Sequence, residues 1–159
     1  MKKILQMLEE DARLTPEQIA VMTEMDTGDI KKAIDEYEKN GTIVAYKALI
    51  DWDQTDREYV SAVIELKVAP QRDRGFDVVA EKICNYPEVK NLFLMSGGFD
   101  LLVIIEGRTM REVAQFVAAK LAPIEAVLST ATHFVLRKYK NNCVVYEAPE
   151  VDERGNGSL

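Results

Sequence analysis

Apolar residues in the first part of the chain recur with helical spacing in three short stretches, which predicts three helices. The first spans residues 2–12. The second begins at the capping signal Thr15-Pro16-Glu17-Gln18 and runs to about Met22. The third is capped by Asp26 and stops at Asn40-Gly41, where a left-handed glycine is expected. The residues expected to face inward are Ile4, Leu5, Leu8 and Ala12 in the first helix, Ile19 and Ala20 in the second, and Ile30, Ala33, Ile34 and Tyr37 in the third.

A stretch rich in β-branched and apolar residues follows from Thr42 to Ile50 and predicts a β segment. Three short helices followed by a β wing are the pattern of a winged helix-turn-helix. The next run, 51–58, is polar and typical of a linker. Trp52 in this run has two interpretations that stand about even: an anchor between domains or subunits, or a core residue beneath the linker.

The rest of the chain alternates between strands and helices in the order β-α-β-β-α-β, the ferredoxin-like arrangement. The expected strands are 59–68, 89–95, 99–106 and 127–137, and the expected helices are 74–85 and 109–121. Phe76, Val79, Ala80 and Ile83 are expected to face inward from the first of these helices, and Val113, Phe116, Val117 and Leu121 from the second. Residues 142–146 are expected to add a short strand.

The fold class expected from these patterns is α+β, with two domains. The expected divisions are a winged helix-turn-helix over 1–50, a linker over 51–58, a ferredoxin-like ligand-binding and dimerisation domain over 59–146, and an acidic, flexible tail over 147–159.

The run Ser96-Gly97-Gly98-Phe99-Asp100 joins the two middle strands and is the chemically most distinctive stretch of the chain. Its two glycines tolerate a positive φ and leave the backbone open to a small molecule. Asp100 begins the second strand, where its carboxylate can hold an ammonium group. An ordinary hairpin, in which Asp100 caps the turn, is the simpler alternative.

Composition narrows the classes of protein that fit. Hydrophobic content of 47% and charged content of 30% are typical of a globular protein, and no apolar run reaches the roughly 18 residues that a membrane span requires. Acidic residues interrupt the first apolar stretch, so a signal peptide is not expected. A cytoplasmic location is therefore expected. Cys84 and Cys143 are far apart and are expected to be reduced, with one disulfide as the alternative. With His133 as the single histidine, neither a metal site nor a cofactor is expected.

The negative charge is concentrated in the first third of the chain. Of the net charge of −7, residues 1–55 carry −5, from 7 basic and 12 acidic residues. The third predicted helix, 26–40, holds 3 lysines and 5 acidic residues. Phosphate contacts dominate DNA affinity and need positive charge, so this helix predicts weak, strongly salt-dependent DNA binding. Asp29 can in principle accept from a cytosine amino group, although a solvated charged face is the simpler interpretation.

In its order of elements and in three motifs, the chain resembles the Lrp/AsnC family of prokaryotic transcription regulators, also called feast/famine regulatory proteins. Residues 41–46 look like the family's G-x-I-x-x-Y segment. Residues 96–100 look like its T/S-G-x-Y/F-D motif. Residues 129–140 look like its T-x-T-x-hydrophobic-hydrophobic strand leading to a lysine. The resemblance covers about residues 2–146, and the order and spacing of the motifs are more specific than any one of them.

The resemblance implies a dimer formed through the sheet of the second domain, further assembly of dimers, and an amino acid or related effector bound between subunits. The effector-binding residues it implies are Ser96, Gly97, Gly98, Phe99, Asp100, Thr130 and Thr132. The simpler alternative for Thr130 and Thr132 is that they have no binding role and are present because threonine favours β-strands. The residues expected to contact double-stranded DNA are Thr27, Lys31, Lys32, Lys39 and Lys47. The chain departs from the family where Lys32 and Ala33 stand at positions at which arginines are common, and where Glu24 replaces the glycine between helices two and three.

Three functions remain open from the sequence. The first is an effector-responsive transcription regulator. The second is a small-molecule sensor or oligomeric partner protein of the same architecture with little or no DNA binding, which the acidic third helix favours. The third is an enzyme, since some proteins of similar two-part architecture decarboxylate sirohaem. One histidine and no clustered acid/base set argue against the enzyme.

Overall fold

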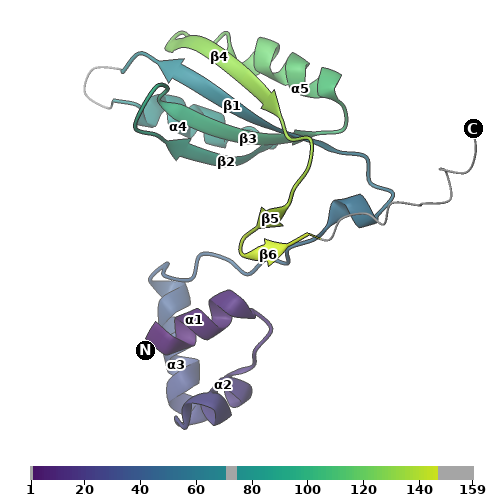
Figure 1. Ribbon diagram of the computed structural model, residues 1–159. Helices are drawn as coiled ribbons and strands as arrows, with labels where there is room; N and C mark the ends of the chain where they lie inside the picture. The colour runs from purple at the N-terminus through teal and green to yellow at the C-terminus, as the bar shows by residue number, and fades with distance from the viewer. Residues whose placement is uncertain (1, 71–74, 147–159) are drawn as a thin grey trace, which may run out of the picture. The chain divides into compact units, whose positions relative to one another are not determined.

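The computed structural model describes residues 2–70 and 75–146 and divides the chain into two compact units, Met1–Ile50 and Asp51–Leu159. The first unit contains the helices α1 (Lys2–Glu10), α2 (Pro16–Thr23) and α3 (Thr27–Lys39) (Figure 1). Its core joins all three helices and consists of Ile4, Met7, Leu8, Ile19, Ala20, Ile30 and Ala33. Two inward-facing predictions differ from the structure: Leu5 is half-buried and Ala12 is exposed, because α1 ends at Glu10.

The caps predicted at the starts of α2 and α3, and the glycine predicted beyond α3, are confirmed. The hydroxyl of Thr15 accepts a hydrogen bond from the N–H of Gln18, and the Gln18 side chain accepts from the N–H of Thr15, which completes a capping box. Asp26 accepts from the N–H groups of Gly28 and Asp29 at the start of α3. Beyond α3, Gly41 has a φ of +76°.

The β segment predicted over Thr42–Ile50 is wrong, since residues 44–50 have no regular secondary structure. The composition suits a strand, but a strand requires a hydrogen-bonded partner, and this unit contains no second strand among its described residues. Val44 is 90% exposed as a result. Ile43 is the member of this segment that packs against the helical core.

The second unit begins with the short 3₁₀ helix η1 (Trp52–Gln54), followed by the four strands of one antiparallel sheet. The strands are β1 (Val60–Val68), β2 (Val89–Leu94), β3 (Leu101–Gly107) and β4 (Val127–Phe134), in the spatial order β2-β3-β1-β4. The helices are α4 (Asp77–Cys84) and α5 (Met110–Phe116), which continues as the π-helical turn η2 (Val117–Leu121). A small hairpin follows, with strands β5 (Lys140–Asn141) and β6 (Val144–Val145).

This order and pairing confirm the predicted α+β class and the β-α-β-β-α-β arrangement, with shorter elements at several ends. Helix α4 begins at Asp77 rather than at residue 74. Strand β4 ends at Phe134 rather than at residue 137, and the predicted strand at 142–146 is reduced to β6. The tail 147–159, predicted to be flexible, lies outside the described residues. The half-buried Trp52 stacks against the guanidinium group of Arg57, 4.3 Å from its ring centroid.

Helices α4 and α5 cover one face of the sheet (Figure 1). Alternate residues of β1 and β3 point into this core, among them Ala62, Ile64 and Leu66, which are fully buried. The neighbouring positions point to the opposite, uncovered face, where Val63 pairs with Ile104 and Glu65 with Leu102. Since no helix of this unit packs there, the half-buried Val63, Leu102 and Ile104 form an apolar strip without a cover among the described residues.

Within residues 2–70 and 75–146, no helix has both the length and the apolar content that crossing a bilayer would require. In the same residues no three histidine, cysteine or carboxylate side chains come together as a metal site would need. Cys84 and Cys143 are both free and exposed, so the disulfide considered from the sequence does not form in this structure.

Candidate functional site

The helix-turn-helix depends on a backbone conformation that suits glycine but is held by a glutamate. Glu24 closes α2 with φ +57° and ψ 30°, and its N–H donates to the carbonyl of Ala20. This left-handed region is sterically disfavoured for any residue that has a Cβ atom. The chain therefore keeps the turn between α2 and α3 although it lacks the glycine that the resemblance implied there.

The expected DNA-contacting residues are spread along α3 and the segment that follows it. Thr27 is the first residue of α3. Lys32 and Lys39 are both exposed and lie seven residues apart, so they share one helical face. Lys31 is already engaged: its ammonium lies 2.7 Å from the carboxylate of Glu17 on α2. Lys47 lies on the separate segment after α3, in a groove beside α1.

Two contacts in this unit escaped the sequence analysis. The Lys31–Glu17 ion pair lowers the pKa of Glu17, chiefly through the hydrogen bond from Lys31. The hydroxyl of Tyr46 donates to the carboxylate of Glu38 at 2.9 Å, and burial followed by this bond raises the pKa of Tyr46. The eight-residue separation of Tyr46 from Glu38 gives no local signal for the second contact. The first could have been considered, since Glu17 and Lys31 lie in the opening turns of neighbouring predicted helices.

The predicted turn between the middle strands exists and is open to solvent. The N–H of Met95 donates to the carbonyl of Asp100 at 2.8 Å and closes it. Gly97 has a φ of +133°, which disfavours any side chain there. A Cβ atom built on Gly97 or on Gly98 would meet no atom within 4 Å. Ser96 is also exposed, whereas Phe99 and Asp100 are half-buried.

Asp100 is hydrogen-bonded to β1 through both its backbone and its side chain. Its N–H donates to the carbonyl of Leu66 at 2.9 Å, and its Oδ2 accepts from the N–H of Val68 at 2.8 Å. At this point the pairing of β1 with β4 shifts register: Lys67 pairs with Ser129 and Val68 with Val127. Leu128 is the extra residue of this β-bulge. The Asp100 side chain thus caps the irregular end of β1, rather than its own turn as the simpler alternative had it, and its Oδ1 has no hydrogen-bond partner among the described residues.

The structure brings Thr130 to the same end of the sheet as Asp100, but on the other side of β1. Thr130 of β4 pairs with Leu66 of β1, which pairs with Leu101 of β3. The backbones of β4 and β3 are therefore two strand spacings apart, roughly 10 Å. Thr132 pairs with Ile64, two residues farther from the turn. Both threonines are half-buried and lie on the face that carries the helices.

His133 points to the uncovered face, opposite in direction to Thr132, as strand alternation predicts. Its Nε2 lies 3.4 Å from a carboxylate oxygen of Glu65 on β1. The side chain of His133 is more than half exposed, and no cluster of acids and bases surrounds it in the part of the chain that the structure describes. The histidine is therefore a surface residue of the sheet.

Two family models match the two units of the chain. Residues 61–145 match the Lrp/AsnC ligand binding domain, and residues 1–44 match a winged helix-turn-helix DNA-binding domain. The first match alone covers more than half of the chain.

The chain is 44% identical over 153 residues to the uncharacterized HTH-type transcriptional regulator YugG of Bacillus subtilis (strain 168), covering 96% of this chain and 92% of that one. It is 33% identical over 131 residues to the uncharacterized HTH-type transcriptional regulator PF1231 of Pyrococcus furiosus, covering 82% and 86%.

Among solved structures, the L-Met complex of the transcriptional regulator NMB0573 from Neisseria meningitidis aligns with a TM-score of 0.72 and 24% identity, covering 92% of each chain. This likeness supports the fold. The family is one of transcriptional regulators and not of enzymes. From the helix-turn-helix, the sheet topology and these matches together, we conclude that the chain is a member of the Lrp/AsnC family of HTH-type transcriptional regulators, with a ligand-binding domain after its DNA-binding domain.

Proposed function

We propose that the protein is a cytoplasmic transcription regulator whose binding to double-stranded DNA responds to an amino acid bound between subunits at the turn Ser96–Asp100. The observation that carries this proposal is the turn itself. Its backbone is open at Gly97 and Gly98, beside the half-buried carboxylate of Asp100, whose Oδ1 has no hydrogen-bond partner within residues 2–70 and 75–146. An amino acid needs an anion for its ammonium and N–H or hydroxyl donors for its carboxylate, and Asp100, the glycine backbone and Ser96 offer these groups.

Thr130 and Thr132 enter the proposal as residues that flank the effector from β4, and Phe99 as an apolar neighbour. Within one chain these threonines are separated from Asp100 by β1. A site that uses both therefore draws them together from different subunits. In NMB0573 the bound molecule is L-Met, which makes methionine a natural first probe for this chain.

The proposed subunit contact is the uncovered face of the sheet. Val63, Leu102 and Ile104 form an apolar strip there. Each Å² of apolar surface removed from water contributes about 25 cal/mol, so packing against a second copy of the chain is favourable. Both faces of an antiparallel sheet can be buried in this way. We propose a homodimer through this face and further assembly of dimers.

The DNA contacts in this proposal are Thr27, Lys31, Lys32, Lys39 and Lys47. Lys31 is neutralised by Glu17, and α3 carries more acids than lysines. This specific contact favours a second candidate function, a small-molecule sensor or oligomeric partner protein that binds DNA weakly or not at all.

One titration separates the two functions. Fluorescence anisotropy with DNA from upstream of the protein's own gene, over a salt series, should give strongly salt-dependent binding. Replacing Lys31 and Lys32 with Ala should lower the salt slope by roughly 2 and weaken binding to all sequences alike. Binding that is unchanged in the double variant would place the DNA surface elsewhere. No binding at low salt would favour the sensor.

A calorimetric screen of the twenty amino acids tests the effector. For an amino acid that binds the turn, Asp100→Asn should weaken affinity about tenfold or more, because a charge-assisted hydrogen bond contributes about 1.5–3 kcal/mol. Gly98→Val should block the open backbone, while the fold stays intact because Gly98 has no positive φ. An amino acid that binds wild type and both variants equally would refute the role of the turn.

A further inference from the structure

The uncovered face of the sheet carries a histidine and a carboxylate side by side next to its apolar strip. His133 of β4 and Glu65 of β1 both point to this face, and Nε2 of His133 lies 3.4 Å from a carboxylate oxygen of Glu65. Glu65 stands opposite Leu102 of β3. His133 stands opposite Val63 of β1, so the pair borders the apolar strip. A subunit that packs on the strip therefore also covers the pair.

Histidine is the side chain whose ordinary change of charge falls between pH 5 and pH 8. His133 is the single histidine of the chain, so any histidine titration of this protein belongs to this position. In the isolated subunit the side chains of His133 and Glu65 are 59% and 38% exposed, and water screens their charges. Covering the face removes this water, so the charge state of the pair then affects the free energy of association.

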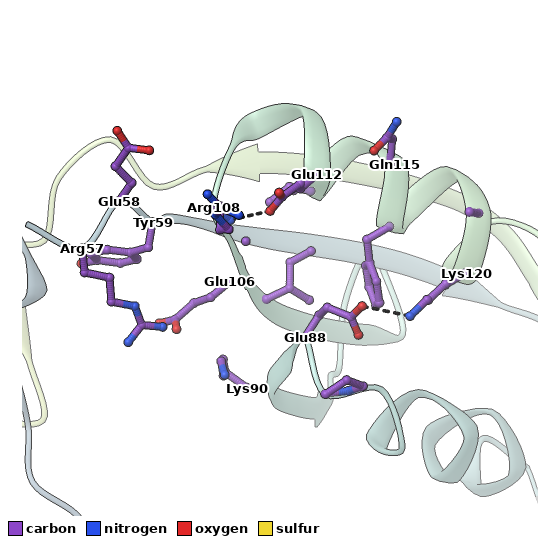
Figure 2. A pocket seen from close by; sticks show the side chains of 16 residues that line it. Arg57, Glu58, Tyr59, Glu88, Lys90, Glu106, Arg108, Glu112, Gln115 and Lys120 are labelled. Atoms are coloured by element: carbon purple, nitrogen blue, oxygen red, sulfur yellow. Dashed lines mark hydrogen bonds and ion pairs between the residues drawn. The ribbon is translucent and has the colours of Figure 1, made fainter.

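The other carboxylates near this face have cations beside them. Glu106, on the same face of β3, interacts electrostatically with Lys138. Glu106 also lines a cavity of about 590 Å³ at the end of the sheet, where it extends toward Arg57 (Figure 2). Glu88, which precedes β2, lies 2.9 Å from the ammonium of Lys120, and its Oε2 is shielded from solvent. Neither carboxylate depends on the histidine to compensate its charge.

Lys67 is the other charged residue on this face of β1. It pairs with Ser129 at the register shift near the end of the strand, and it is exposed. Within residues 2–70 and 75–146 it forms no ion pair with Glu65. In this part of the chain, the group in contact with Glu65 that can carry a positive charge is His133, and it does so only when protonated.

We infer that dimerisation through the uncovered face takes up protons at His133, so that the dimer is favoured at lower pH. The dimer is the one proposed above, and the proton linkage rests on it. With His133 protonated, each subunit brings a neutral ion pair into the interface. With His133 neutral, each subunit brings a carboxylate without a counter-ion, and burying such a charge is costly.

A second copy of the chain is the partner that suits this patch. An acid and a base lie beside each other on one surface, so the surface is complementary in charge to its own copy across a twofold axis. The same axis presents the pair twice. Up to two protons are therefore taken up for each dimer that forms.

Sedimentation of the full chain, labelled for fluorescence detection and studied from nanomolar to micromolar concentration, measures the dissociation constant of the dimer. At constant ionic strength, the wild-type constant should rise about tenfold or more from pH 6 to pH 8. His133→Gln is neutral throughout and should give a constant that does not change with pH. Glu65→Gln should reverse the trend, because the protonated histidine then lacks a carboxylate.

The concentration-dependent urea midpoint of the same proteins gives the same comparison where the dimer persists at nanomolar concentration. Glu125→Gln removes the same charge as Glu65→Gln at an exposed position outside the strands, and it should keep the wild-type pH dependence.

The outcomes distinguish the proton linkage from the proposed dimer. A wild-type protein that is monomeric at micromolar concentration at pH 6, 7 and 8 refutes the proposed dimer face, and the proton linkage with it. A dimer whose dissociation constant does not rise from pH 6 to pH 8 overturns the proton linkage alone. The same holds if the rise persists in His133→Gln, or if Glu65→Gln keeps the wild-type trend.

Discussion

The carboxylate of Asp100 accepts a hydrogen bond from the backbone N–H of Val68 at 2.8 Å, across 32 positions of the chain. The bond joins the first residue before β3 to the last residue of β1, at the point where β4 bulges. One carboxylate therefore has two possible uses, as a cap for a strand end and as an anchor for a ligand.

Variants of Asp100 separate these two uses. Asp100→Ala should lower the free energy of unfolding by about 1–3 kcal/mol, because it leaves the N–H of Val68 without an acceptor. Asp100→Asn keeps an acceptor oxygen and should cost less than about 1 kcal/mol. Urea denaturation of both variants measures the difference. Equal losses in the two would show that the charge of Asp100, rather than an acceptor at this position, stabilises the domain.

Glu24→Gly is expected to stabilise the helix-turn-helix. The φ of +57° at Glu24 costs a residue with a Cβ atom roughly 1–2 kcal/mol, and the greater freedom of unfolded glycine offsets about 0.5–1 kcal/mol. A net gain of about 1 kcal/mol should appear as a higher denaturation midpoint. Glu24→Ala, which keeps the Cβ, is the matched control and should give little gain. A destabilised glycine variant would mean that the Glu24 side chain has a role of its own.

Glu17→Gln should strengthen DNA binding by releasing Lys31 from its ion pair. A freed lysine on α3 adds about one phosphate contact, so the salt slope should steepen by up to roughly 1. Glu10→Gln changes the net charge by the same amount on α1 and serves as the control. Equal effects of both substitutions in anisotropy titrations would point to overall charge instead of the Glu17–Lys31 pair.

Ile104→Glu should convert the proposed dimer into a monomer of 18.0 kDa. Ile104 lies in the apolar strip on the uncovered face of the sheet, and a charge buried in a subunit interface costs several kcal/mol. Sedimentation equilibrium at micromolar concentration measures the mass. Val21→Glu, an equivalent change at a solvent-exposed position of α2, should leave the assembly unaltered. A wild-type protein that is monomeric under these conditions would contradict the proposed interface.

Glu88 should contribute a pH-dependent part of the stability. Because the hydrogen bond from Lys120 lowers its pKa below 4.5 in the folded state, the unfolded chain takes up the proton first as the pH falls. The stabilisation is therefore present above about pH 4.5 and is lost as the pH drops through the folded pKa. Glu88→Gln should remove this pH dependence. The free energy of unfolding that depends on it is less than about 1 kcal/mol, because the side chains of Glu88 and Lys120 are both more than a third exposed. Urea denaturation at pH 7 and pH 3.5 measures the pH dependence of the free energy of unfolding, with Glu125→Gln as the control variant.

Local chemistry along the chain determined most of the secondary structure. The capping box at Thr15, the Asp26 cap and the left-handed Gly41 involve residues within a few positions of one another, so the sequence alone predicts them. The short apolar runs of β1 and β3 and the helical spacing around them likewise predicted the β-α-β-β-α-β order, whereas the alternation of buried and half-buried positions appears only in the structure. The turn at Gly97-Gly98 was predictable for the same local reason.

Only the tertiary structure decided what depends on partners far away in the chain. Residues 44–50 have the composition of a strand but no strand beside them, and β pairing is not a local property. The bond from Val68 to Asp100, the face on which Thr130 and Thr132 lie, and the shielded oxygen of Glu88 all follow from strand register and helix packing. Periodicity states which residues face inward, whereas register, set by packing between distant segments, decides which side chains meet.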